Sequence, residues 1–175
     1  MKNKILGVFV SLLTVAMLAV PIAAVSATKP IQIAGKWRPT NTVPISPPKY
    51  AGANVFTYFS VEGEYFEGPI IGDFVHTIEI IMHFGEPEQM LPATFNWKIE
   101  RTFEGTVEVN EVTYEGTLLI RLNAKGTIPG GPGVLKGTWV IISGTDELAN
   151  LHGQGKWTNL VGAEFYYEGQ IHFDP

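Results

Sequence analysis

Alternation of apolar and polar residues is the sequence feature that most constrains the fold of this 175-residue chain. In the segment 165–173, aromatic or aliphatic residues and Gly169 occupy every second position, and mostly polar residues fill the positions between. A strand with one buried face and one solvated face has this period of two. Segments of this composition, rich in Val, Ile, Thr and aromatic residues, are predicted to be strands at Val55–Phe66, Asp73–Phe84, Thr94–Glu108, Val112–Ala124, Leu135–Ile142, Leu151–Thr158 and Ala163–Phe173.

Glycine- and proline-rich turns separate these segments, for example Glu67-Gly68-Pro69 and Gly85-Glu86-Pro87. Beyond residue 27, no stretch longer than two turns has helical periodicity. Short strands at such regular spacing predict an all-β sandwich or barrel. A single antiparallel barrel of seven or eight strands is favoured, because closure removes exposed sheet edges and the chain has no cysteine for a disulfide.

The first 27 residues have the composition of a secretory signal peptide. A basic start, Met1–Lys4, precedes an apolar run, and Val25-Ser26-Ala27 offers small residues for cleavage after Ala27. We therefore expect a secreted or extracytoplasmic protein with no stable membrane span after cleavage. The alternative is an uncleaved N-terminal membrane anchor, since the apolar run approaches the length that spans a bilayer.

Composition excludes several classes of chemistry. Without cysteine there is no thiolate zinc site, iron–sulfur cluster or cysteine nucleophile. A net charge of −5 argues against nucleic-acid binding, which depends on basic patches.

Residues 28–53 contain several prolines and one short aromatic segment. We expect one strand at about 32–38, which either joins the barrel or stands apart from it, followed by an irregular Pro-rich arm. The barrel domain itself is expected over 54–175. The outward row of Asp73–Phe84 is partly apolar, so the arm or a partner subunit is expected to cover it, which leaves a homo-oligomer open.

The C-terminal half resembles a known family. The run Gly126-Thr127…Gly137-Thr138-Trp139, continuing through Ser143-Gly144-Thr145-Asp146-Glu147-Leu148 to Leu151-His152-Gly153-Gln154-Gly155, resembles the Gly-Thr-Trp and Leu-x-Gly-x-Gly pattern of the allene oxide cyclase-like barrel proteins. Within that group it is similar to a small prokaryotic barrel family of unknown function, and Tyr167–Phe173 resembles that family's last strand. The resemblance covers roughly 94–173, and 55–84 more loosely. It implies an eight-stranded, calycin-like antiparallel barrel, and no catalytic residue transfers from it.

The corner between Ile142 and Leu151 is predicted to contain a short helical turn at about 146–150. Thr145 is expected to cap this turn, and Asp146 and Glu147 suit its N-terminus. Leu148 and Leu151 are expected to plug the barrel end.

Two charged or titratable residues interrupt rows that are otherwise apolar. Arg101 lies in the row of Phe95 and Phe103, and His76 lies in the row of Phe74 and Ile78. Inside a barrel either would need a partner, such as a buried acid or a ligand carboxylate. The alternatives are an Arg101 that reaches water from the barrel mouth and a His76 that is a satisfied core or rim residue. The candidate ligand-binding residues are Trp97, Arg101, His76, Phe103 and Tyr167.

Other catalytic and metal-binding patterns are weak. His76 and His83 should point to opposite faces of one strand, and no third ligand is evident beside His152 and His172. No metal site or cofactor is therefore expected, no nucleophile elbow surrounds Ser143, and Gly130-Gly131-Pro132-Gly133 is expected to be a hairpin turn. The pairs Glu62/Glu64 and Glu100/Glu104 lie on strand faces expected to be solvated.

Three functions fit these observations. The first is non-catalytic binding of a small apolar or amphipathic ligand in the barrel. The second is a cyclase or isomerase that acts through cavity shape, as the resemblance suggests. The third is a cell-surface interaction or assembly protein with a filled barrel.

Overall fold

The computed structural model describes residues 29–84, 92–126, 135–160 and 163–174. The expected signal peptide and its cleavage after Ala27 lie outside these residues, as does the expected hairpin turn at 130–133. Within the described part of the chain, no helix is long and apolar enough to cross a membrane.

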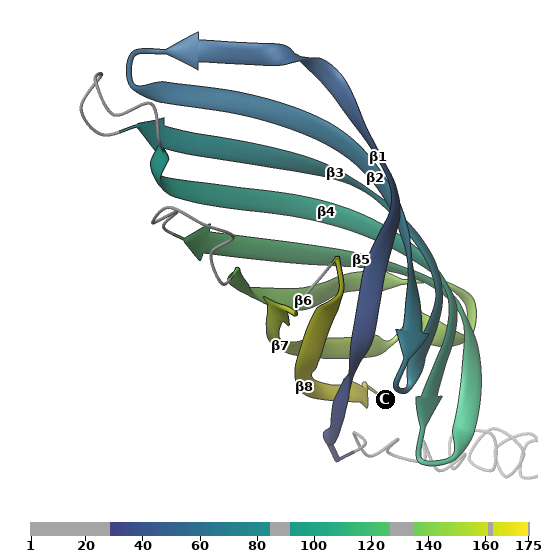
Figure 1. Cartoon of the computed structure of the whole chain (residues 1–175). Helices are drawn as coiled ribbons and strands as arrows, with labels where there is room; N and C mark the ends of the chain where they lie inside the picture. Colours follow the sequence, from purple (N-terminus) through teal and green to yellow (C-terminus); the bar gives the residue numbers. More distant parts are fainter. Residues whose placement is uncertain (1–28, 85–91, 127–134, 161–162, 175) are drawn as a thin grey trace, which may run out of the picture.

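Eight antiparallel strands follow one another in chain order around a closed barrel (Figure 1). The strands are β1 (Ile31–Ala51), β2 (Asn54–Glu67), β3 (Ile70–Phe84), β4 (Pro92–Val109), β5 (Val112–Gly126), β6 (Lys136–Gly144), β7 (Leu151–Asn159) and β8 (Phe165–Phe173). A single 3-10 turn, η1 (Asp146–Leu148), lies between β6 and β7. The predicted eight-stranded antiparallel barrel with a short helical turn is confirmed.

The first strand is much longer than the sequence analysis indicated. The expected irregular arm after residue 38 is wrong, because β1 continues through Pro39, Pro44 and Pro47 to Ala51. Its residues 31–37 pair with β8, and its residues 36–51 pair with β2, with register shifts around the prolines. Almost every residue of β1 thus has a paired neighbour on one side only. Proline has no amide hydrogen to donate, so it is tolerated at such positions.

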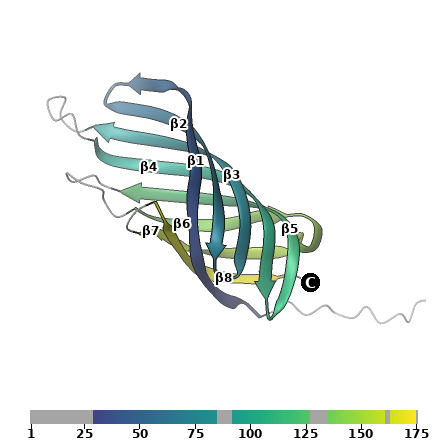
Figure 2. The same ribbon diagram turned by 45° about the vertical axis from the view of Figure 1, so that its right-hand side comes forward.

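The stagger of the strands explains the length of β1. A path from Lys36 through the paired residues of β8, β7, β6, β5, β4, β3 and β2 returns to β1 at Lys49 instead of Lys36. A barrel with such a stagger has steeply tilted strands, and β1 must run diagonally along the seam to close it. Figure 2 shows β1 running steeply in front of β4, β5 and β6, which lie behind it in this view.

One end of the barrel is closed by the corner that contains η1. Leu148 and Leu151 are fully buried in the same core cluster as Val109 and Ile171, so the predicted plug is confirmed. Thr145 occupies the predicted N-cap position of η1, but its side chain makes no capping hydrogen bond. Its hydroxyl donates to the Asp146 carboxylate at 2.7 Å and accepts from the Thr117 amide at 3.3 Å, so it ties the corner to β5.

Aromatic rings packed over glycines fill much of the interior. The ring of Trp139 lies so close to Gly155 and Gly169 that a Cβ at either glycine would come within 2.6 or 2.5 Å of it. The ring of Trp157 packs in the same way against Gly137. Alternating large and small inward residues fill a small barrel with side chains, so this part of the lumen is solid core.

The outer face of β3 is not covered by the proline segment. Val75 is 53% exposed and Ile71 is 44% exposed, while the proline segment pairs edge-on with β2. The expectation that this segment packs over β3 is therefore wrong. A partner subunit at this face stays a prediction.

Candidate functional site

Arg101 lies in the centre of the barrel. It belongs to the inward row of β4, where Phe103 and Ile99 are its neighbours, and its exposed fraction is 0%. The guanidinium carbon lies 4.0 Å from the ring centroid of Trp37 and 3.7 Å from that of Phe74. The expected place at the barrel mouth is wrong, because the register of β3, β4 and β5 puts Arg101 among the most deeply buried positions.

Two side chains accept hydrogen bonds from this guanidinium. Arg101 Nη1 donates to the Tyr65 hydroxyl at 2.8 Å, and Nε donates to His76 Nδ1 at 3.3 Å. The third nitrogen, Nη2, is buried and has no hydrogen-bond partner. No carboxylate of the described residues forms an ion pair with Arg101; the ion pairs there lie on the outer surface.

Electrostatics keep His76 neutral. Burial first, and then the nearby Arg101 charge, lower the pKa of His76 to about 2. Burial also lowers the pKa of Arg101, although a guanidinium stays charged in proteins. The expected reading of His76 as a satisfied core residue agrees with its burial and with the bond from Arg101 Nε.

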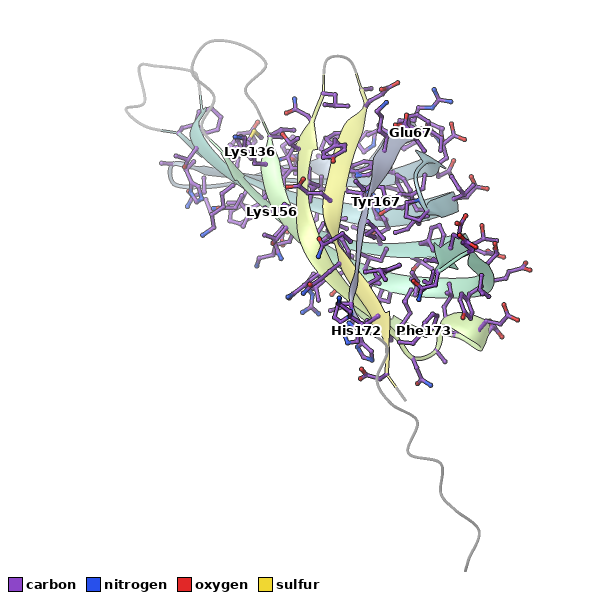
Figure 3. The ribbon with its side chains drawn as sticks, turned by 90° about the horizontal axis from the view of Figure 1, so that it is seen from below. Glu67, Lys136, Lys156, Tyr167, His172 and Phe173 are labelled. Carbon is purple, nitrogen blue, oxygen red and sulfur yellow. The ribbon has the colours of Figure 1, made fainter. Side chains whose placement is uncertain are left out.

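Tyr65 connects this centre to two more of the predicted residues. Its ring makes edge contacts with Phe103 and with Tyr167, both at 5.5 Å between centroids. The Tyr167 hydroxyl occupies the space that Gly35 leaves by having no side chain, and burial raises the pKa of Tyr167. Figure 3 shows Tyr167 on β8, well separated from Phe173 at the other end of that strand.

Trp97 stands apart from the arginine. It lies four positions from Arg101 on β4, and its ring approaches Trp157 at 6.3 Å, which in turn packs edge-on against Trp37 at 6.1 Å. Trp97 belongs to a group of partly buried inward apolar side chains at the end opposite η1. We call this group the mouth: Phe59, Ile80, Trp97, Leu135 and Phe165.

The structure thus brings four of the five predicted residues together around Arg101, either directly or through Tyr65, and leaves Trp97 at the mouth. The sequence analysis missed Tyr65, Trp37 and Phe74 as partners of the guanidinium. Phe74 was visible in the inward row of His76, but placing Trp37 and Tyr65 beside it required the register of β1 and β2.

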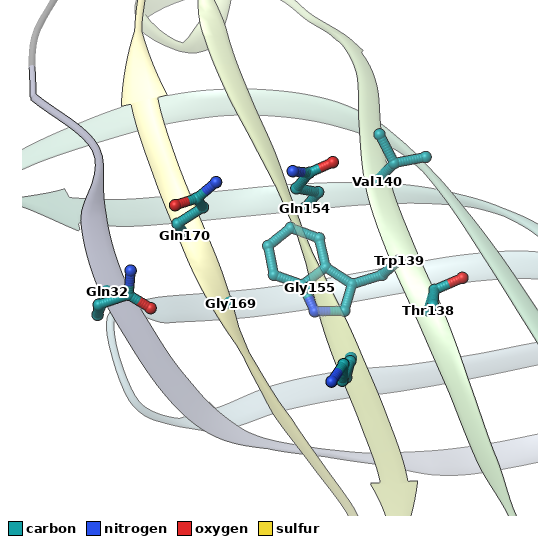
Figure 4. Close-up of a pocket in the computed structure, with 9 residues that line it drawn as sticks. Gln32, Thr138, Trp139, Val140, Gln154, Gly155, Gly169 and Gln170 are labelled. Carbon is teal, nitrogen blue, oxygen red and sulfur yellow. The ribbon is translucent and has the colours of Figure 1, made fainter.

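A separate groove of about 440 Å³ crosses the outer wall over β1, β8, β7 and β6. Figure 4 shows the amides of Gln32, Gln170 and Gln154 along it, with the Trp139 ring behind Gly155. Beside it, His152 and His172 are paired across β7 and β8, and each Nε2 lies 3.3 Å from a carboxylate oxygen of Asp174. Asp174 is thus a third possible metal ligand beside these two histidines, and the sequence analysis did not identify it. Even so, no cluster of three or more such side chains in the described residues has an arrangement that could hold a metal ion.

Comparison with known proteins shows the fold. No protein-family model matches the chain, and no curated protein matches its sequence. A solved structure, a protein of unknown function from the DUF3224 family of Shewanella oneidensis MR-1, aligns with a TM-score of 0.59 and 12% sequence identity, covering 84% of this chain and 99% of that chain. The likeness is one of fold. It supports a small barrel of unknown function and adds nothing to the resemblance to allene oxide cyclases.

Proposed function

We propose that the protein binds a small apolar or amphipathic molecule in its barrel, without catalysis. The observation that carries this proposal is the difference between the two ends of the barrel. At the η1 end the fully buried Leu148 and Leu151 close the lumen, although Ile31, Tyr114 and Phe173 nearby are only partly buried. At the other end the described residues include no such plug, and the mouth side chains are only partly buried beside the buried Phe95. A barrel closed at one end and apolar at the other has the form of a binding cup.

The chemistry of the interior favours binding over catalysis. The buried polar or charged side chains of the described residues are Thr57, His76 and Arg101, with no carboxylate among them. A general base works best with a pKa near the operating pH, and the pKa of His76 lies far below it. The carboxylate pairs Glu62/Glu64 and Glu100/Glu104 point outward; Glu64 pairs with Arg38 and Glu100 with Arg121.

Two further proposals rest on the amino-acid sequence. We propose that the chain is exported by its N-terminal signal sequence, on the residues of 1–27 alone. We also propose a place in the allene oxide cyclase-like barrel superfamily, on the sequence pattern from Gly126 to Gly155 and on the last strand, Tyr167–Phe173.

Binding is tested with a neutral fluorescent probe, N-phenylnaphthylamine, on the full chain, together with native mass spectrometry of protein isolated from its own source without detergent. We expect saturable binding of the probe, and a bound small molecule that is released on unfolding. The variant Ile80→Glu places a charge at the mouth and should abolish probe binding. Its matched control is Ile71→Glu, an exposed outward position on the same strand, which should bind as the wild type does.

Circular dichroism and thermal unfolding establish that both variants are folded. Absence of saturable binding together with an empty native protein would overturn the proposal. Equal loss of binding in both variants would show that the probe binds outside the mouth, and that result also counts against it.

A further inference from the structure

Three lysines without an ion-pair partner lie close together on the outer wall of the barrel. Lys125 and Lys136 lie directly opposite each other on β5 and β6. Lys156 lies on β7 opposite Thr138, which is two residues from Lys136 along β6. All three lysines are exposed, and no carboxylate of the described residues forms an ion pair with them. Figure 3 shows Lys136 and Lys156 on this wall. A group of positive charges thus lies on a chain whose net charge is −5.

The pairing of Lys125 with Lys136 costs stability. Like charges directly opposite each other in an antiparallel pair are destabilising. The outward positions beside them in the same strands are uncharged: Asn123, Thr138 and Thr158. Glu168 lies opposite Lys156 on β8 but forms no ion pair with it. An anion bound between the lysines would remove the repulsion, so this part of the wall has the properties of an anion-binding surface.

The groove on the outer wall includes one of these lysines. Lys156 lines it together with the amides of Gln154, Gln170 and Gln32, which lie on β7, β8 and β1 (Figure 4). The three glutamines are paired in register, so their amides form one row with a spacing of about 4.8 Å from strand to strand. None of the three amides hydrogen-bonds to another described residue, and no carboxylate lines the groove. The row is therefore free to bind a ligand.

The chemistry of the groove matches a sugar chain that carries negative charges. An amide side chain both donates and accepts hydrogen bonds, as the hydroxyl groups of a sugar do. The spacing of the amide row is similar to the length of one sugar residue in an extended chain. Lysine supplies a point charge for an anionic group such as a carboxylate or a sulfate. A row of neutral amides beside a group of lysines thus suits a polymer with many hydroxyl groups and regularly spaced negative charges.

We propose that this outer wall binds an acidic polysaccharide, whose anionic groups contact Lys125, Lys136 and Lys156 and whose hydroxyl groups hydrogen-bond to the glutamine row. A membrane surface fits less well, because interfacial binding needs an apolar face and the outward positions around the lysines are polar. An acidic peptide has the negative charges but lacks the hydroxyl groups. The site lies outside the lumen and is independent of ligand binding in the barrel.

Titration calorimetry on the full chain compares probes of similar length: hexagalacturonate, a heparin hexasaccharide, neutral maltohexaose and hexaglutamate. We expect the two acidic sugars to bind about tenfold more tightly, or better, than maltohexaose or hexaglutamate. Heparin carries sulfates as well as carboxylates, so the relative affinities of the two acidic sugars identify the preferred anionic group. Binding should weaken as the salt concentration rises, because salt screens exposed charges.

Two double variants separate the charges from the amides. Lys125→Gln, Lys136→Gln should lower the affinity for the acidic sugars about tenfold. Because it removes a repulsion, it should not lower the midpoint of thermal unfolding. Gln154→Ala, Gln170→Ala should lower the affinity for the acidic sugars and leave the weak binding of hexaglutamate unchanged. An unchanged affinity for the acidic sugars in either variant would contradict the site.

The matched control is Lys29→Gln, Lys49→Gln, which changes the net charge equally at exposed positions outside this wall and should bind as the wild type does. Equal loss of affinity in the control would show that net charge alone acts, and would overturn the proposal. So would failure of both acidic sugars to bind, or equal affinity for hexaglutamate. Vesicles that contain phosphatidylglycerol test the membrane: if they bind through the lysines and the sugars do not, the wall is a membrane-binding surface instead.

Discussion

Arg101 Nη1 and the Tyr65 hydroxyl form a 2.8 Å hydrogen bond between β4 and β2, strands that are not neighbours in the sheet. The bond therefore passes over the inward face of β3, which lies between them, and it joins the only buried guanidinium of the described residues to a ring that also contacts Phe103 and Tyr167. Four of the five predicted site residues meet around this one bond.

Tyr65→Phe removes the acceptor and leaves a second guanidinium nitrogen unpaired. A hydrogen bond to a charged group contributes about 1.5–3 kcal/mol, so the free energy of unfolding should fall by about that amount. Urea denaturation at neutral pH measures it. Tyr114→Phe is the matched control, because Tyr114 is partly buried against Phe173 and should change stability by about 0.5 kcal/mol or less. Equal effects in the two variants would contradict a special role for the Tyr65 hydroxyl.

His76 makes stability depend on pH. Its pKa is about 2 in the folded chain and 6.5 in the unfolded chain, so between these values the unfolded state binds more protons. The contribution of neutral His76 to the free energy of unfolding is therefore complete above the unfolded pKa of 6.5, and it is lost as the pH falls below that value. Going from about pH 7 to about pH 5.5 should cost about 1 kcal/mol.

The variant His76→Gln retains an acceptor for Arg101 Nε and has no titrating group, so it should lose this part of the pH dependence. The half-exposed His152 provides the control, and His152→Gln should retain the loss of stability on acidification. Urea midpoints at the two pH values measure both. An unchanged slope in His76→Gln would mean that His76 is not the group responsible.

Gly155→Ala tests how tightly the interior is filled. The added Cβ would meet the Trp139 ring, and overpacking of this kind costs about 1–3 kcal/mol. Thermal unfolding should show a clear decrease in midpoint. Gln154→Ala, at the adjacent outward position, should change stability by about 0.5 kcal/mol or less. If Gly155→Ala left the midpoint of thermal unfolding unchanged, the Trp139 ring would have room to move.

The prolines of β1 are expected to protect its unpaired edge. Residues 38–51 pair with β2 alone, and an edge strand without proline can pair with another copy of the chain. The triple variant Pro44→Val, Pro47→Val, Pro48→Val should associate with rising concentration, as measured by light scattering. The double variant Thr77→Val, Thr102→Val adds apolar area to strands that are paired on both sides, and it should not associate.

The local pattern of the sequence determined the strands, the inward rows and the closed end. The rows of Phe95–Phe103 and Phe74–Ile80 point inward as predicted because a strand's side chains alternate faces whatever its neighbours are. The buried Leu148 at the β6–β7 corner follows from the same local pattern. These features need only the residues next to them in the chain.

Tertiary structure alone decided the course of β1 and the surroundings of Arg101. The prolines of β1 did not indicate that this strand would continue past residue 38. Closure of the staggered barrel requires its length, and local preference does not. Alternation likewise showed that Arg101 points inward but not how deep it lies. Its depth and its contacts with Tyr65 and Trp37 depend on the register of strands far apart in sequence, which only the closed barrel specifies.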